Sequence, residues 1–479
     1  MWPHGNERKI LMETKSRKIK LRDLIFMNIS ALYGIRWIAK STAASFGLGV
    51  AAIPMWLIFA ILFFVPQALI CAELASEYPS DGGLYVWVKE ALGEKYGFMA
   101  SWLNWTSKLF WYASFMTFFT INIAYLIGKP ELLENKYATL LCSVVVFIIL
   151  SVLSCRGMAW GKIFTNTGAL GSTIPAVIMI LFAFIGILVL RKAEPASTYY
   201  VKDLVPSMDA NSFVAVSAII FGYTGGEVAA NFVTEMENPR KNYPKAIFVS
   251  AVLVASIYVI GSIAITMLLP TDQIQASTGI LDAIQKGAEN LGIGYWLVQL
   301  VAFGIAFSML GATLIYIASP IKMLFGSVPK GMFSEKLTTA NKVGIPERAI
   351  YLQAAIVSVL LICTSLFPGV DAIYNVLVTM TALTALFPYV LLLISYIKLK
   401  KSKKMQNQVY VMAKKDSTCI LIGRVVLVLC IIGIILTCTP VMGDLKSNII
   451  YEIEMIGGGI LVIVSGLLLW NYFSKKIYK

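Results

Sequence analysis

Long apolar runs separated by short polar segments dominate the sequence, and this pattern predicts an all-α polytopic membrane protein. Each run is long enough to cross a hydrocarbon layer of about 30 Å at 1.5 Å per residue. We therefore expect twelve transmembrane helices and no large soluble domain. The predicted spans are residues 21–47, 51–77, 97–127, 137–155, 163–190, 211–236, 245–269, 293–321, 350–367, 371–397, 418–438 and 450–472.

Two of the predicted helices contain residues that oppose a continuous helix inside a membrane. The first span reads Ala31-Leu32-Tyr33-Gly34-Ile35-Arg36-Trp37, and the sixth reads Phe221-Gly222-Tyr223-Thr224-Gly225-Gly226-Glu227. A glycine costs a helix about 1 kcal/mol relative to alanine, and a backbone opened in hydrocarbon must find other partners. We predict that both helices are broken where they face protein, water or a solute. The alternative is a packing face of small residues, which Gly222 and Gly226 also fit.

The two predicted breaks stand at equivalent places in two halves of the chain. Five spans begin with the first break and five with the second, and an odd number of spans inverts the second half in the membrane. This arrangement is typical of inverted-repeat transporters with a solute site between the halves. The predicted parts are a basic tail (1–20), two five-helix repeats (21–190 and 211–397), helices 11 and 12 (418–472) and a short C-terminal tail (473–479).

Composition and charge support a membrane protein with a defined orientation. Hydrophobic residues make up 58% of the chain and charged residues 14%, whereas about a quarter of a soluble protein is charged. The net charge of +14 is explained by the positive-inside rule rather than by nucleic acid, because 30 of the 40 Lys and Arg residues fall in segments that would face the cytoplasm and 7 in outer loops. We expect a plasma (inner) membrane protein with both termini cytoplasmic. We interpret the Lys398–Lys404 run as an orientation signal and as a contact for anionic lipid.

Several classes of chemistry lack support in the sequence. The seven cysteines are scattered and the only histidine is His4, so we expect neither a metal site nor a cofactor. The chain has no Walker lysine motif, GxSxG or HExxH, which argues against ATP-driven transport and against an enzyme. Whether the protein is a monomer or a homodimer is left open.

Two stretches and the twelve-span plan resemble a known group of transporters. The stretches are AELASEYPSDGGLYVWVKEALG, which starts at Ala72, and FGYTGGEVAANFVTEMENPRKNYPKAI, which starts at Phe221. They are similar to the amino acid–polyamine–organocation superfamily, and most similar to its glutamate/γ-aminobutyrate antiporter branch. The resemblance implies a LeuT-type five-plus-five inverted repeat with helices 1 and 6 broken. Many relatives carry a GxG motif in the first break, where this chain has Gly34-Ile35-Arg36-Trp37.

A zwitterionic amino acid needs hydrogen-bond donors at one end and acceptors at the other, and two broken helices supply both. The half-helix after Gly34 would offer N–H groups to a carboxylate, and the half-helix before Gly222 would offer carbonyls to an ammonium. Aromatic residues would close over the solute or, alternatively, pack against lipid and other helices. The candidate substrate-binding residues are Tyr33, Gly34, Ile35, Arg36, Phe221, Gly222, Tyr223, Gly225, Gly226 and Tyr316.

Ionisable residues within the spans are candidates for selectivity, coupling or gating, because charge is costly in hydrocarbon. Arg36 would hold an acidic substrate or pair structurally with Glu227. Lys108 and Glu227 are the coupling and gating candidates, although Lys108 has the alternative of facing an aqueous vestibule without a selective role. Glu73 and Glu235, near cytoplasmic helix ends, suit inner-gate or structural roles.

The most specific hypothesis is a secondary amino-acid transporter that exchanges acidic amino acids and their decarboxylation products by alternating access. A neutral or cationic amino-acid or polyamine transporter coupled to protons is the alternative, as is an amino-acid sensor that moves nothing. Spans 8 and 10 should complete the vestibule with Ser308, Thr313, Tyr316, Tyr374, Thr381 and Thr384. Ser308 and Thr313 would be ligands to sodium or, more simply, hydrogen bonds between helices.

Overall fold

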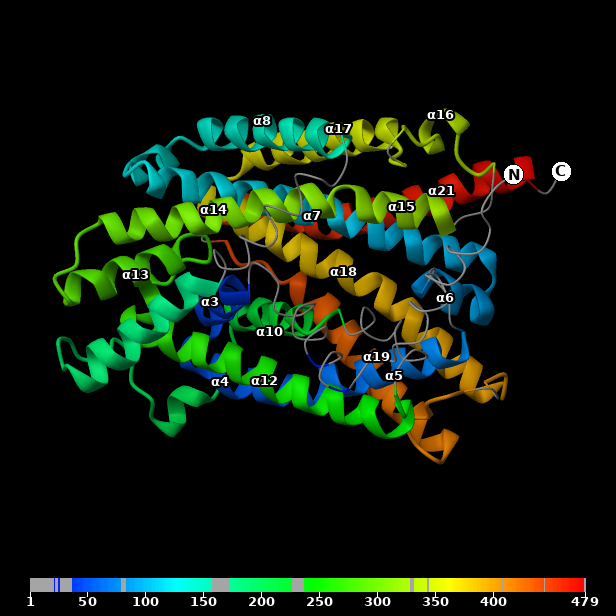
Figure 1. Cartoon of the computed structure of the whole chain (residues 1–479), viewed down its shortest axis with the longest axis horizontal. Coiled ribbons are helices and arrows are strands. Elements are labelled where there is room, and N and C mark those ends of the chain that lie inside the picture. Colours follow the sequence, from blue (N-terminus) through cyan, green and yellow to red (C-terminus); the bar gives the residue numbers. More distant parts are fainter. Residues whose placement is uncertain are drawn as a thin grey trace, which may run out of the picture.

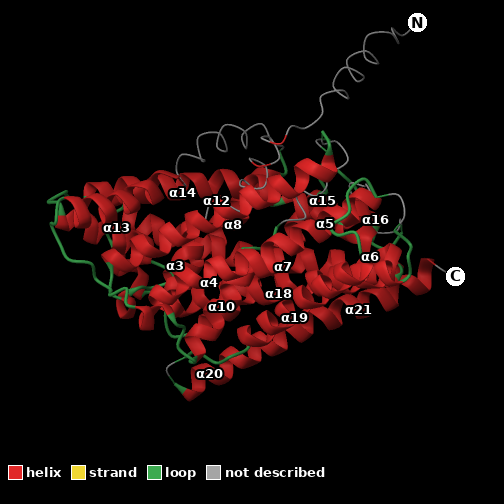
Figure 2. Ribbon diagram, turned by 90° about the horizontal axis from the view of Figure 1, so that it is seen from below, coloured by secondary structure: helices red, strands yellow, loops and turns green. Residues whose placement is uncertain are grey.

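The computed structural model describes residues 21, 25, 37–78, 83–156, 173–225, 237–327, 331–342, 344–405, 408–442 and 444–477. In this part of the chain every regular element is a helix, and the helices form one elongated bundle (Figures 1 and 2). Nine helical stretches there are long and apolar enough to cross a membrane: Lys40–Glu77, Glu94–Leu126, Lys136–Ser154, Arg240–Leu268, Trp296–Leu314, Glu347–Leu366, Val370–Lys401, Asp416–Thr437 and Leu445–Lys475. Two shorter apolar helices are Thr173–Val189 and Ala210–Gly222. The chain is therefore a polytopic helical membrane protein.

A turn at Gly49 divides the first long stretch. It separates α3 (Trp37–Leu48) from α4 (Ala52–Phe59), and Gly49 has a φ of +52°, which L side chains rarely adopt. A Cβ there would also lie 2.8 Å from the side chain of Thr271. This turn falls between the predicted first and second spans. α4 continues through a π-helical turn into α5 (Val65–Glu77).

Two long helices form the centre of the bundle. These are α7 (Glu94–Leu126) and α18 (Val370–Lys401), which pack along one another (Figures 1 and 2). The apolar segments of these helices are 83% and 72% buried, whereas those of α19 (Asp416–Thr437) and of the last stretch (Leu445–Lys475) are each only 28% buried. The last two spans are therefore peripheral. The described chain also contains α8 (Lys136–Ser154), α12 (Pro239–Leu268), α14 (Trp296–Tyr316), α15 (Ala318–Ser327), α17 (Glu347–Cys363), α20 (Leu445–Glu452) and α21 (Gly458–Ile477).

Two shorter helices lie between spans. Helix α6 (Leu84–Leu92) is the first of these, and it ends at Gly93, which has a φ of +95°. Helix α13 (Gly279–Asn290) was not predicted. The hydroxyl of Tyr125 on α7 donates to Asp282 of α13 at 2.5 Å, which ties this connecting helix to the central one.

A buried ion pair joins α5 to α18. Lys400 contacts Glu73, and their side chains are only 3% and 0% exposed. Tyr396 donates to the same carboxylate at 2.6 Å, and Asp416 of α19 lies 3.3 Å from the lysine. Glu73 therefore has a structural partner, in line with one of its two predicted roles. The prediction that the whole lysine run contacts lipid is wrong for Lys400, because this ammonium is turned inward to a carboxylate.

The segment between α18 and α19 crosses the ends of α5 and α12. The hydroxyl of Ser76 donates to the carbonyl of Tyr410 at 3.1 Å and accepts from its N–H at 3.3 Å. Arg240 of α12 donates to the carbonyl of Val409 at 3.0 Å. Tyr410 is buried, and its ring lies 5.6 Å from that of Tyr243. These contacts hold four helices together at one end of the bundle.

Replacing Lys400 with methionine is expected to lower stability strongly. Glu73 would lose its cation while staying buried, and breaking one side of such a pair typically costs about 3–5 kcal/mol. Thermal unfolding of the purified protein in detergent measures the effect, with Lys401→Met as the control because Lys401 is exposed. The double variant Glu73→Gln/Lys400→Met should recover much of the loss. Equal melting temperatures for Lys400→Met and Lys401→Met would contradict the assignment.

Candidate functional site

The predicted site residues divide into those that the structure describes and those that it does not. Tyr33, Gly34, Ile35, Arg36, Gly226 and Glu227 lie outside the described residues, as does Glu235. The described candidates are Phe221, Gly222, Tyr223, Gly225, Tyr316 and Lys108. The first four surround one end of α10 (Ala210–Gly222), from which the site is built.

Helix α10 ends at Gly222, inside the predicted span 211–236. At its other end Asp209 caps the helix by accepting from the N–H of Ser212 at 2.8 Å. Hydrogen bonds from Ser207 and Ser212 lower the pKa of Asp209, so the cap stays ionised at neutral pH. Residues 223–225 are not helical, and Gly225 has a φ of +117°. Helix α10 thus ends at the position of the predicted break, and residues 226–236 on the far side of that break lie outside the described residues.

The last carbonyls of α10 all have donors. The carbonyls of residues 219–221 accept from the backbone N–H groups of Tyr223 and Thr224 at 3.0–3.2 Å. The carbonyl of Gly222 accepts from Nζ of Lys40 at 3.1 Å. Lys40 belongs to α3, which packs against α10 (Figure 1). The carbonyl of Gly222 thus already binds an ammonium of the protein itself.

Aromatic side chains enclose this helix end. Trp56 of α4 stacks on Tyr258 of α12 with ring centroids 4.1 Å apart, and its indole N–H donates to Ser262 at 3.2 Å. Tyr223 is fully buried, and its hydroxyl donates to the carbonyl of Trp56 at 2.7 Å. A Cβ on Gly222 would lie 2.9 Å from the Trp56 ring. Glycine is therefore required there by close packing, and Tyr223 is held against α4.

A hydrogen bond from the chain beyond α10 reaches the central helix α18. The N–H of Gly225 donates to the hydroxyl of Tyr389 at 2.7 Å. Phe221, one turn earlier, is half-buried. The end of α10 is thus contacted by α3, α4, α12 and α18. Movement of any one of these helices would therefore change the contacts at this helix end.

Lys108 and Tyr316 belong to a second group, on α7 and α14. Lys108 is half-buried, and Trp111 and Tyr112 follow it on the same helical face at spacings of three and four residues. Tyr112 donates to the carbonyl of Tyr316 at 2.6 Å, and the ring of Trp111 meets that of Tyr316 edge-on at 5.7 Å. Tyr316 itself is 52% exposed, at the end of α14.

Four hydroxyls that we expect to line the vestibule, two of them (Ser308 and Thr313) as sodium ligands or interhelical contacts, behave differently from one another. Thr313, Thr381 and Thr384 each donate to a carbonyl of their own helix at 2.6–2.8 Å, so they do not link helices. Ser308 is buried, and its hydroxyl has no hydrogen-bond partner among the described residues. These observations give no support to a bond between helices at any of the four positions.

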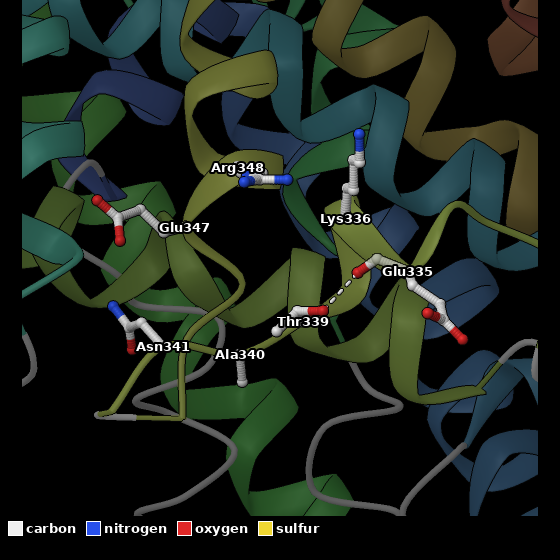
Figure 3. Close-up of a pocket in the computed structure, with 7 residues that line it drawn as sticks. All are labelled: Glu335, Lys336, Thr339, Ala340, Asn341, Glu347 and Arg348. Carbon is white, nitrogen blue, oxygen red and sulfur yellow. Dashed lines mark hydrogen bonds between the residues drawn. The ribbon is translucent and has the colours of Figure 1, made fainter.

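A cavity of about 360 Å³ lies elsewhere, around the connection between α16 (Glu335–Thr338) and α17 (Figure 3). It is lined by charged and polar side chains, and Thr339 at its edge donates to the carbonyl of Glu335 at 2.6 Å. No candidate site residue lines it. We therefore do not assign the solute site to this cavity.

Comparison with known proteins identifies the family. The amino acid permease family model matches residues 19–461. The chain belongs to the amino acid permease family. This agrees with the superfamily that the sequence resembles, and it makes the permease a transporter rather than an enzyme.

Curated relatives of this permease share most of its length. It is 30% identical to an uncharacterized transporter of Legionella pneumophila over 468 residues, 97% of this chain and 98% of that protein. It is 24% identical to a protein of Lactococcus lactis named as a probable agmatine/putrescine antiporter, over 96% of each chain. It is also 25% identical to the glutamate/γ-aminobutyrate antiporter of Lactococcus lactis subsp. lactis, over 73% of this chain and 70% of that protein.

Several residues at the end of α10 were not among the predicted site residues of the permease. They are Lys40, Trp56, Tyr258, Ser262 and Tyr389. Lys40 carried a signal, since it is a basic residue inside a predicted span and follows the first break by six positions. The four others carried none, because buried aromatic and hydroxyl residues are common in every span.

Replacing Gly222 with alanine is expected to destabilise the permease. The new methyl group would overlap the Trp56 ring, which Tyr258 and Ser262 hold in place, and such overpacking costs about 1–3 kcal/mol. Thermal unfolding in detergent measures the effect, and Gly457→Ala is the matched control because a Cβ there meets nothing within 4 Å. A Gly222→Ala protein as stable as the control would show that the ring moves freely.

Proposed function

We propose that this permease is a secondary active exchanger of amino acids that works by alternating access. The observation that carries the proposal is the end of α10 at Gly222 within the bundle, where four other helices meet it. A helix that stops inside a membrane is tolerated where it lines a cavity or a solute site. The names of the antiporter relatives support exchange as the mode of transport.

The proposed architecture has twelve helices with two inverted repeats, residues 21–190 and 211–397, and a solute site between their broken first helices. Residues 33–36 and 226–227 would complete this site from the two breaks. Lys108 and Tyr316 would contribute from α7 and α14. We place the protein in the plasma (inner) membrane with both termini in the cytoplasm, because the basic residues cluster in the loops that would lie there. It would act as a monomer or a homodimer.

The preferred substrates are acidic amino acids and their decarboxylation products. Arg36 and Lys108 place positive charge within the predicted spans, which favours a solute with a carboxylate at its free end. The relative named as a glutamate/γ-aminobutyrate antiporter supports this choice. The second candidate is a polyamine or cationic amino-acid transporter coupled to protons, which is favoured by the agmatine/putrescine relative because that match extends over 96% of the chain.

Exchange in proteoliposomes tests the proposal. Vesicles loaded with unlabelled glutamate or γ-aminobutyrate should take up labelled glutamate faster than empty vesicles. In an exchanger, the transporter reorients across the membrane faster with a bound substrate than without one. Vesicles without the protein are the control, and labelled alanine and arginine test the alternatives. Robust arginine exchange with no glutamate exchange would favour the second candidate, and uptake independent of internal solute would reject exchange.

Gly226→Leu tests whether the interruption of helix 6 is the site. A leucine side chain is expected to fill the space that the solute occupies, so transport should be lost while the folded protein is retained. Transport in proteoliposomes and size-exclusion chromatography of the purified variant measure the two effects. Wild-type uptake by this variant would place the solute elsewhere.

A further inference from the structure

The end of α10 holds an ammonium group of the protein itself. The C-terminal end of a helix carries partial negative charge, and a cation is stabilised there. Nζ of Lys40 lies 3.1 Å from the carbonyl oxygen of Gly222 and 3.2 Å from the hydroxyl of Tyr258. It also lies 5.8 Å from the centroid of the Tyr258 ring, within range of a cation–π contact.

The surroundings of Lys40 fix where this ammonium can lie. The next residue, Ser41, donates to the carbonyl of Tyr258 at 3.2 Å, which joins α3 to α12. Tyr258 is fully buried and stacks on Trp56. The Trp56 ring in turn presses against Gly222. The packed side chains of Tyr258 and Trp56 therefore hold the Lys40 side chain at the end of α10.

We propose that Lys40 determines the specificity of the permease by excluding substrates with a cation at both ends. Its ammonium fixes a positive charge at the end of α10, where the proposed solute site lies. A substrate with one ammonium and a carboxylate at its other end is compatible with this charge, whereas a second substrate cation is repelled by it. The proposal rests on the proposed function, and it separates this chain from its agmatine/putrescine-named relative in substrate class.

Two matched pairs of small molecules isolate the effect. γ-Aminobutyrate and putrescine both carry an ammonium on a short methylene chain, but the other end is a carboxylate in the first and an ammonium in the second. Glutamate and ornithine differ in the same way at the end of the side chain. Repulsion between two partly screened unit charges corresponds to a change in affinity on the order of tenfold or more. The ratio of affinities within a pair therefore reports on the charge at the far end of the substrate.

The experiment compares the wild type with Lys40→Met and with Lys136→Met as the matched control. Lys136 also donates to backbone carbonyls, those of Ser365 and Phe367 at 2.8 and 2.7 Å, but on α8, away from the described end of α10. Each purified protein is titrated with the four compounds by thermal shift, and each compound is tested as a competitor of exchange in proteoliposomes.

The wild type and Lys136→Met should prefer the carboxylate-ended member of each pair. Lys40→Met should shift the ratio toward putrescine and ornithine by about tenfold or more. An unchanged ratio in a folded Lys40→Met protein would overturn the inference. So would wild-type binding of putrescine as tight as that of γ-aminobutyrate, a result that does not depend on whether the variant folds. Exchange that fails while the thermal-shift ratios behave as expected would reject the proposed function and leave the role of Lys40 standing.

Discussion

A helix end that is buried inside a bundle must have its last carbonyls satisfied by the protein, because burial keeps water from donating to them. At the end of α10 the backbone just beyond the helix supplies donors for three of them, and Lys40 supplies the donor for Gly222. The surrounding structure follows from this requirement. A glycine is needed so that the Trp56 ring can lie against the helix end, and Tyr258 both stacks on that ring and contacts the ammonium.

The same helix end connects parts of the chain that are far apart in sequence. Lys40 and Gly222 are 182 residues apart, and Gly225 and Tyr389 are 164 apart. One hydrogen bond joins α3 to α10, and the other joins the segment after α10 to the central helix α18. The proposed exchange cycle needs a place where several helices move together, and this helix end has the contacts for that role.

Features set by local sequence were predictable. The spans follow from the lengths of the apolar runs. The end of α10 follows from the glycines at and after residue 222, which lower the stability of a helix at that position. Helix α6 and its stop at Gly93 also follow from local turn residues. Features that depend on which residues meet in space were not predictable from one sequence. The contact of Lys40 with Gly222 is of this kind, as is the inward orientation of Lys400, because the other four lysines of the Lys398–Lys404 run look the same in the sequence. Helix α13 was missed because its amphipathic pattern lies inside what reads as a polar outer loop.

The ion pair between Glu73 and Lys400 has a consequence for how the chain is made. The two residues are separated by 327 positions, from 73 to 400. At a synthesis rate of about 5–20 residues per second, the glutamate emerges roughly 15–65 s before its lysine. Throughout that interval the carboxyl group lacks the ammonium that it contacts in the folded protein. The packing of α5 against the end of α18 through this ion pair is therefore a late step, after most of the other helices have been synthesised.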